Sequence, residues 1–76
     1  MDPNQNQARN DDLEKRFTYH PPKEGQPKKY EAIRFEAKRL AYLLSNFCPH
    51  SRELSLALTH LEDAVMWANA AIARNE

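Results

Sequence analysis

The sequence predicts an all-α fold, in which two long helices form an antiparallel hairpin that follows an extended N-terminal arm and assembles into a helical homo-oligomer. Three observations lead to this prediction. Two segments carry apolar residues at alternating steps of three and four, which is typical of one helix face. A Cys-Pro-His sequence separates these segments. More apolar residues remain than two helices can bury against each other, which favours self-association.

The first long helix is expected over residues 27–47. Pro27 suits a first helical turn, because the amide hydrogen that proline lacks would have no partner there. Strong helix formers follow it as far as Phe47. The residues of its apolar stripe are Ile33, Ala37, Leu40, Leu44 and Phe47.

The second long helix is expected over residues 51–74. Pro49 cannot continue the hydrogen-bond ladder of the preceding helix, and Ser51 supplies an N-capping side chain with Glu53 near the positive end. The residues of its apolar stripe are Leu54, Leu58, Leu61, Val65, Ala68 and Ile72. The short connection between two helices of similar length predicts an antiparallel pair whose stripes face each other.

The residues before the hairpin are different in composition. Residues 1–14 are polar and acidic with little to bury, so we expect disorder or a frayed helical turn there. Residues 15–26 contain the only glycine and a Pro-Pro pair, which favours an extended arm that carries Phe17, Tyr19 and His20. The hairpin domain is therefore expected to span residues 15–76.

Self-association is expected because a chain of 76 residues with one cysteine has few other means of stabilisation. No internal disulfide can form, and the Cys and His residues are too few and scattered for a zinc site. Alanines let helices approach closely, and large apolar side chains off the stripes supply anchors. The expected oligomer interface includes Tyr30, Leu43, Met66, Trp67 and Ala70.

The charges cancel in number but not in distribution. The chain has 11 basic and 11 acidic side chains, and the net charge is −3 over residues 1–14, +5 over residues 15–39 and −2 over residues 40–76. A protein that binds a long nucleic acid usually carries an excess of basic side chains, so a chain with no net charge is a poor candidate for this class. No apolar run approaches the ~20 residues of a membrane span, and the polar start is no signal peptide, so we expect a cytoplasmic protein.

Residues that could carry catalysis are few. Cys48 and His50 lie in the expected turn, with no identifiable acid or oxyanion donors, and His60 lies about two helical turns away. Glu62 and Asp63 are adjacent and project from different parts of the helix, which suits a solvated surface. We therefore expect no enzymatic activity, no metal and no cofactor.

A ligand site is indicated where the aromatic arm precedes the basic start of the first long helix. Tyr19 offers a flat face, and Arg34 and Lys38 project from one side of the helix at a spacing of four. Stacking surfaces beside cations are what a nucleotide requires. His20 and Asn69 are candidates for hydrogen bonds to base edges. Alternatively, the arm only pins the hairpin and the cations form a solvated face with nearby glutamates.

Three sequence runs also resemble a known family. They are RFTYHPP (16–22), QPKKYEAIR (26–34) and CPHSRELSLALTHLEDAVMWANAAIARNE (48–76), and AVMWANAAIAR (64–74) is distinctive within its subgroup. They resemble the hairpin domain of the phage anti-CBASS and anti-Thoeris sponges. The resemblance implies a homohexamer that holds cyclic dinucleotides or trinucleotides between protomers, in the host cytoplasm if a phage encodes it, and withholds them without hydrolysis.

The resemblance also implies residue roles. Tyr19 matches an aromatic residue that stacks on a base, and Arg34 matches a phosphate-binding cation that is a lysine in characterised members. A separate trinucleotide site in the family uses an arginine on the second helix, where this chain has Ala70, so Arg74, one turn further along, is the candidate to replace it. A cyclic ADP-ribose remains an alternative ligand. The alternatives in function are a protein-interaction module without a nucleotide and a DNA-binding hairpin.

Overall fold

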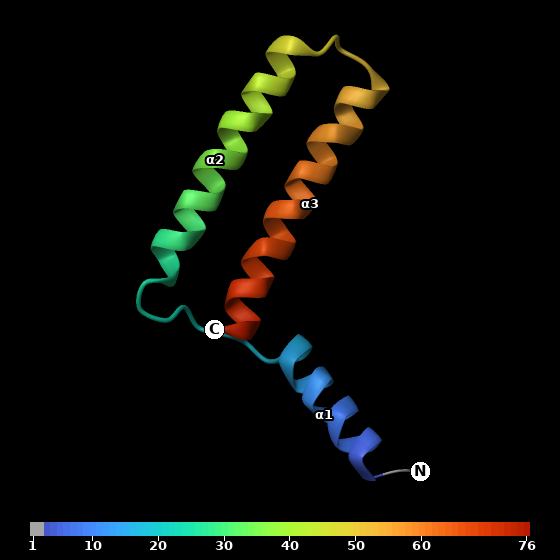
Figure 1. Ribbon diagram of the computed structural model, residues 1–76, viewed down its shortest axis with the longest axis vertical. Coiled ribbons are helices and arrows are strands. Elements are labelled where there is room, and N and C mark those ends of the chain that lie inside the picture. The colour runs from blue at the N-terminus through green and yellow to red at the C-terminus, as the bar shows by residue number, and fades with distance from the viewer. Residues whose placement is uncertain (1–2) are drawn as a thin grey trace.

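A computed structural model describes residues 3–76, and within them the chain forms three helices and no strand (Figure 1). Helix α1 spans Pro3–Phe17, α2 spans Gln26–Phe47 and α3 spans Arg52–Asn75. Helices α2 and α3 lie side by side and antiparallel, and α1 projects from the end of the hairpin where α3 finishes (Figure 1). The prediction of an all-α hairpin is confirmed.

The two long helices begin and end within one residue of the expected positions, and their ends are locally specified. Gly25 precedes α2 with φ at 85°, a left-handed conformation that favours glycine. The amide of Cys48 donates to the carbonyl of Leu44 at 2.9 Å where α2 ends. At the start of α3, Ser51 Oγ accepts from the amide of Leu54 at 3.1 Å. Backbone groups at the hairpin turn thus have partners.

The Ser51 cap makes a measurable prediction. Ser51→Ala should lower the free energy of unfolding by about 1 kcal/mol, because the amide of Leu54 loses its acceptor at a helix end. Chemical denaturation followed by circular dichroism measures the change. Ser55→Ala, an exposed serine one turn later, is the matched control and should change stability much less. Equal effects of the two substitutions would exclude a capping role for Ser51.

Helix α1 corrects two expectations about the N-terminal residues. The disordered or frayed tail expected over residues 1–14 is helical from Pro3, with Met1 and Asp2 outside the described residues, and the expected arm over residues 15–26 shortens to an irregular segment at 18–25. Side chains four residues apart bond along α1: Gln7 to Asp11 at 2.9 Å and Arg16 to Asp12 at 3.1 Å. Each such pair adds about 0.2–0.5 kcal/mol of helix stability.

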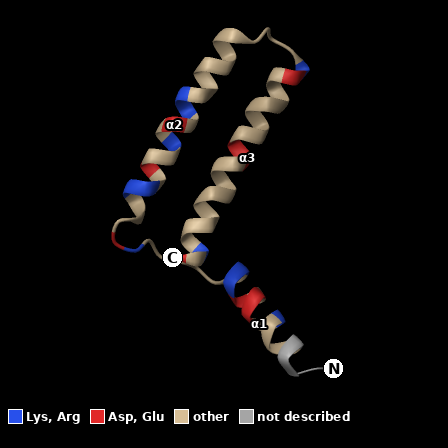
Figure 2. Cartoon of the chain, viewed as in Figure 1, with Lys and Arg blue, Asp and Glu red and all other residues tan. Residues whose placement is uncertain are grey.

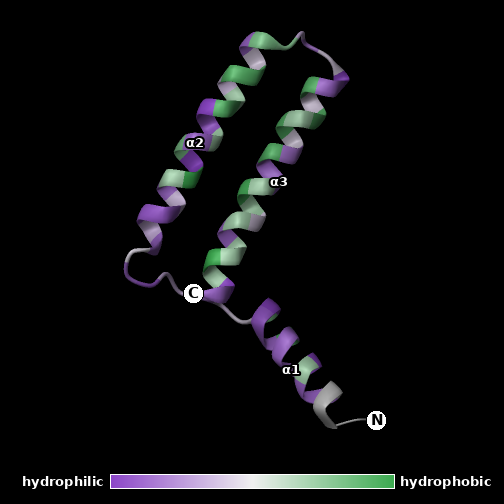
Figure 3. Cartoon of the chain, in the orientation of Figure 1, coloured by the Kyte–Doolittle hydropathy of each residue, from purple (hydrophilic) through white to green (hydrophobic). Residues whose placement is uncertain are grey.

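The hairpin packs its two apolar stripes against each other but leaves them only partly covered. Leu54, at 6% exposure, is the single buried apolar residue within the described chain, whereas Leu40 and Phe47 of the expected stripe remain 44% and 80% exposed. Hydrophobic residues are frequent along α3 and in the second half of α2, whereas α1 is mostly hydrophilic (Figure 3). A single chain therefore has the apolar stripes of a hydrophobic core, but it leaves most of their side chains partly exposed.

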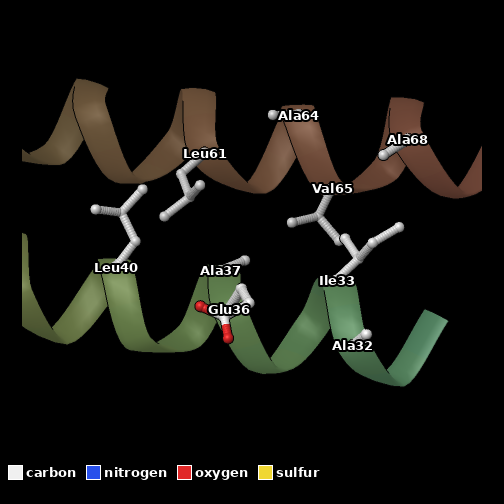
Figure 4. A pocket seen from close by; sticks show the side chains of 9 residues that line it. All are labelled: Ala32, Ile33, Glu36, Ala37, Leu40, Leu61, Ala64, Val65 and Ala68. Carbon is white, nitrogen blue, oxygen red and sulfur yellow. The ribbon is translucent and has the colours of Figure 1, made fainter. Parts of the chain in front are cut away.

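A groove of about 520 Å³ runs between α2 and α3 on one side of the hairpin. Ile33 and Leu40 of α2 and Leu61 and Val65 of α3 point into the space between the helices (Figure 4). We call it the apolar groove; its other lining residues are Ala32, Glu36, Ala37, Ala64 and Ala68. Small side chains on both helices leave the groove open to an approaching helix.

The irregular segment 18–25 is tied to the end of α3. The side-chain oxygen of Gln26, which is 3% exposed, accepts from the amide of Lys23 at 2.9 Å, and its Nε2 donates to the carbonyl of Ile72 at 3.4 Å. Lys23 also donates to the carbonyl of Glu76, and Lys29 forms an ion pair with the Glu76 carboxylate. These bonds place the entry to α2 against the last turns of α3.

The chain is elongated rather than globular. Its radius of gyration is 17.3 Å, whereas a compact domain of this length has about 11 Å. Within residues 3–76, no helix has the length and apolar character needed to cross a membrane.

Candidate functional site

A hollow of about 400 Å³ lies where the first turns of α2 meet the last turns of α3. Tyr30 and Arg34 line it from α2, one turn apart, and Asn69, Ala70 and Ala73 line it from α3. The antiparallel hairpin brings these two segments together, although about 40 residues separate them in the sequence. We call this the polar hollow, because it combines a guanidinium, a phenol and a carboxamide.

Asn69, which lines the polar hollow, has an unused acceptor. Its Oδ1 atom is buried and has no hydrogen-bond partner among the described residues. A buried polar group without a partner costs about 1–3 kcal/mol, and a ligand with an N–H or O–H group would remove that cost. Base edges and ribose hydroxyls carry such donors.

The cations beside the polar hollow lack acidic partners. In the described chain the ion pairs of α2 are Lys29 with Glu76 and Arg39 with Glu36 at 3.5 Å, so Arg34 and Lys38 are both unpaired. Arg34 also lines an adjoining hollow of about 500 Å³ that Lys38 shares with Glu62 of α3. Figure 2 shows basic residues, with acidic residues among them, from the start of α2 to past its middle, and no charged residue in the rest of that helix. An anionic ligand would find two available cations there, with one carboxylate opposite.

Tyr19 and His20 lie away from Arg34 within one chain. The Tyr19 side chain is 80% exposed and does not line the polar hollow. The His20 ring donates through Nε2 to the carbonyl of Lys15 at 2.8 Å, which satisfies one of the last carbonyls of α1. His20 therefore has a structural role in ending α1. The folded chain brings Arg34 and Asn69 together, but it does not bring Tyr19 to them.

Arg74 and Trp67 line a different hollow, of about 310 Å³, together with Arg16 and Phe17 from the end of α1. This grouping was not predicted, because nothing in the sequence indicated that α1 would end beside α3. Ala70, the position that matches the family arginine, lines the polar hollow, and Arg74, the candidate to replace that arginine, does not. We call the Arg16, Phe17, Trp67 and Arg74 site the arginine–aromatic hollow.

The residues expected at an oligomer interface divide into two groups. Leu43, Met66 and Trp67 are 48%, 62% and 68% exposed, so a partner could cover them. Tyr30 and Ala70 are half-buried and line the polar hollow instead. Sequence reasoning missed Gln26, although a polar residue beside Pro27 at the start of a helix offers a weak signal for a role in positioning.

Within residues 3–76, no three Cys, His, Asp or Glu side chains are grouped so that they could hold a metal ion. The chemistry of the polar hollow is that of binding: a guanidinium for an anion, a carboxamide for a donor and an aromatic ring beside them. Tyr30, which was expected at an interface, supplies that ring within the chain.

Comparison with known proteins gives one match. The model of the family described as Acb2/Tad1, hairpin domain, matches residues 9–73, which include most of α1 and nearly all of the hairpin. No curated protein and no solved structure matches the chain.

Proposed function

This chain belongs to the Acb2/Tad1 hairpin-domain family of phage anti-CBASS and anti-Thoeris sponges, which are known for sequestering cyclic nucleotides, and we propose that it binds a cyclic oligonucleotide immune messenger without hydrolysing it. Cyclic dinucleotides are the first candidates. The observation that carries the proposal is the polar hollow, which is lined by the unpaired Arg34 and by Asn69, whose side-chain oxygen has no partner in the described chain. By holding the messenger, the protein would counteract host anti-phage signalling in the cytoplasm.

Each binding residue has a proposed task. Arg34 holds a phosphate through its planar guanidinium, which keeps the charge of the lysine seen in other members and adds a second donor direction. Lys38 adds a second positive charge, and Asn69 accepts a hydrogen bond from a base or sugar. The ring of Tyr19 is exposed and does not line the polar hollow of its own chain. We therefore assign Tyr19 to the site of a neighbouring protomer, where it stacks on a base of the bound ligand.

The working unit in this proposal is a homo-oligomer, with a homohexamer as the family's form. The area that the chain exposes supports assembly: it is 6565 Å², whereas a folded monomer of 8.9 kDa exposes about 4,800 Å². A standard interface covers about 800 Å² of each partner, so the excess corresponds to about two interfaces per chain. Among the exposed apolar surfaces, the apolar groove is the face that we assign to assembly.

Isothermal titration calorimetry with a panel of cyclic dinucleotides, cyclic trinucleotides and cyclic ADP-ribose tests the proposal. We expect at least one ligand to bind with a Kd below about 100 μM. Recovery of that ligand intact by chromatography, after the protein is denatured, would distinguish sequestration from hydrolysis. Binding weaker than this for the whole panel would exclude the sponge function, and a degraded ligand would exclude a non-catalytic one.

An interaction module without a nucleotide is the second candidate, and the exposed side chains of Met66 and Trp67 favour it. Such a protein would be assembled but would carry no ligand. The two functions differ in a simple measurement, since nucleotide that co-purifies with the protein adds absorbance near 260 nm. A protein that purifies without this excess and binds none of the calorimetry panel would support the interaction module.

A further inference from the structure

Gln26, the first residue of α2, is the single buried polar residue in the described chain, at 3% exposure. A buried carboxamide is costly unless its donor and its acceptor both have partners. Here Oε1 accepts from the amide of Lys23 at 2.9 Å, and Nε2 donates to the carbonyl of Ile72 at 3.4 Å. A backbone amide can only donate and a carbonyl can only accept, so these partners fix the orientation of the carboxamide. One side chain therefore connects the irregular segment 18–25 to the last turns of α3.

The chain makes a tight turn immediately before Gln26. The amide of Gln26 donates to the carbonyl of Lys23 at 3.0 Å, and Gly25 between them has φ 85° and ψ −19°. These are features of a type II turn, in which the third residue needs a positive φ. The backbone bond and the side-chain bond of Gln26 thus close the same turn. Together they fix Lys23 relative to the hairpin.

Tyr19 depends on this turn, because its own side chain is 80% exposed and little packing holds it. The two prolines at 21–22 separate His20 from Lys23 and restrict rotation of the chain between them. The ring of His20 bonds in turn to the carbonyl of Lys15 in α1 at 2.8 Å. A short and stiff path therefore runs from Lys23 to Tyr19 and the end of α1.

The residues before Lys23 have little else to attach them to the hairpin. In the described chain, the side-chain hydrogen bonds and ion pairs of residues 6–22 all join partners within that stretch. The end of α1 lies beside α3 at the arginine–aromatic hollow, but Phe17 there is 81% exposed, so packing holds it weakly. The bonds of Lys23 and Gln26 are thus the main connection between the segment that carries Tyr19 and the hairpin.

We propose that Gln26 is a positioning residue for ligand binding: by fixing Lys23 against α3, it sets where Tyr19 stands for the base on which it stacks. This inference rests on the proposed function, because Tyr19 has this task only if the protein binds a nucleotide. Gln26 lines none of the hollows described above, so its effect on the ligand is transmitted through Tyr19. Loss of the carboxamide leaves Tyr19 in place in the sequence but free to move.

Calorimetry on single variants gives the first part of the test. The probes are cyclic di-AMP, cyclic di-GMP and cyclic GMP–AMP, and the tightest binder is used throughout. Gln26→Leu, which is similar in size and has no polar side-chain atoms, should weaken binding about fivefold or more, because a base loses its stacking partner. Gln7→Leu makes the same change at an exposed glutamine of α1 and should change affinity less than about twofold.

Double variants show whether the effect passes through Tyr19. In Tyr19→Ala, where the stacking ring is absent, adding Gln26→Leu should weaken binding less than about twofold further. In Arg34→Lys, which keeps Tyr19 and a phosphate-binding charge, adding Gln26→Leu should again weaken binding about fivefold. If Gln26 acted only on folding, it would lower affinity by the same factor in both backgrounds. That result would overturn the inference.

A conservative variant and a protease complete the test. Gln26→Glu keeps the acceptor for the Lys23 amide and places its charge at a helix start, so it should retain more affinity than Gln26→Leu. If circular dichroism shows that Gln26→Leu is unfolded, Gln26→Glu takes its place in the double variants. Trypsin should cut after Lys23 at least about fivefold faster in Gln26→Leu, whereas cleavage after Lys38 within α2 should not change. Unchanged cleavage after Lys23 would also overturn the inference.

The outcomes separate this inference from the proposed function. Absence of binding to the unaltered chain, across all probes and the wider panel above, would overturn both. Binding to the unaltered chain, with equal losses from Gln26→Leu in the Tyr19→Ala and Arg34→Lys backgrounds, would leave the proposed function standing and overturn only the role of Gln26.

Discussion

Arg34→Ala is expected to weaken the binding of a cyclic dinucleotide by about 10- to 150-fold, and this is the largest effect that we expect from one binding residue. A hydrogen bond to a charged group contributes about 1.5–3 kcal/mol, and Arg34 lines both of the hollows on its side of the hairpin. Calorimetry on the purified variant measures the change.

The control for this prediction comes from the same helix. Arg39 is also exposed on α2, but it pairs with Glu36 and lines neither hollow that contains Arg34. Arg39→Ala should therefore change affinity less than about threefold, and Arg34→Lys should retain more binding than Arg34→Ala. Because Arg34 has no acidic partner in the described chain, its removal leaves no buried charge, and stability should change little. Equal losses in Arg34→Ala and Arg39→Ala would show that only net charge matters.

The hairpin was predictable because its signals are local. The alternating steps of the apolar stripes, Pro49 and the Ser51 cap each act over a few residues, and together they specify two helices and a turn. The stripes also identified Leu54, the most buried apolar residue. What the stripes did not give is the degree of burial: Leu40 and Phe47 remain exposed, because two helices enclose less volume than a bundle.

Helix α1 was not predicted because its residues lack an apolar stripe, and disorder is the usual interpretation of a polar segment. The bonds between Gln7 and Asp11 and between Arg16 and Asp12 depend on a spacing of four residues that is easily overlooked among many polar side chains. The position of α1 has a consequence for the site. It brings Phe17 to Trp67, a juxtaposition that no local pattern could indicate.

The candidate site was predictable in part, because some of its signals are also local. Arg34 and Lys38 were found from their spacing on one helix, and the antiparallel turn then fixes which residues of α3 lie opposite. Asn69 was named for its chemistry, but the burial of its oxygen without a partner is a property of packing. Tyr19 illustrates the limit of a single chain, because its proposed partner site belongs to another protomer.

The apolar groove, which we assign to assembly, and the cations that we assign to the ligand lie on opposite sides of the hairpin. The apolar groove is lined almost entirely by alanine, leucine, isoleucine and valine, with Glu36 at its edge, whereas Arg34, Lys38 and Glu62 line the other side. A buried charge would be costly inside the apolar groove, whereas the cations on the other side can bind an anionic ligand. The separation allows a substitution to affect assembly without touching the cations that bind the ligand.

Ala64→Glu is expected to dissociate the oligomer. Ala64 lines the apolar groove yet is exposed in one chain, so a longer side chain fits the isolated hairpin but would place a charge inside an interface, in a groove that Glu36 also lines. Burying an unpaired carboxylate costs several kcal/mol. We expect this cost to outweigh the stabilisation from an interface of standard size. Sedimentation velocity should show the particle mass fall toward 8.9 kDa, and the melting temperature should fall with it, because assembly stabilises the fold.

Two companion variants separate the causes. Ala64→Lys places a positive charge in the same groove instead; if it also dissociates the particle, the cost is burial of a charge and not repulsion from the Glu36 carboxylate. Thr59→Glu adds the same carboxylate at an exposed position of α3 outside the groove and should keep the assembly intact. An unchanged particle mass in Ala64→Glu would assign assembly to another face. Because cyclic dinucleotide binding draws on Tyr19 of a neighbouring protomer in our proposal, the dissociated Ala64→Glu protein should also lose affinity while it retains Arg34 and Asn69.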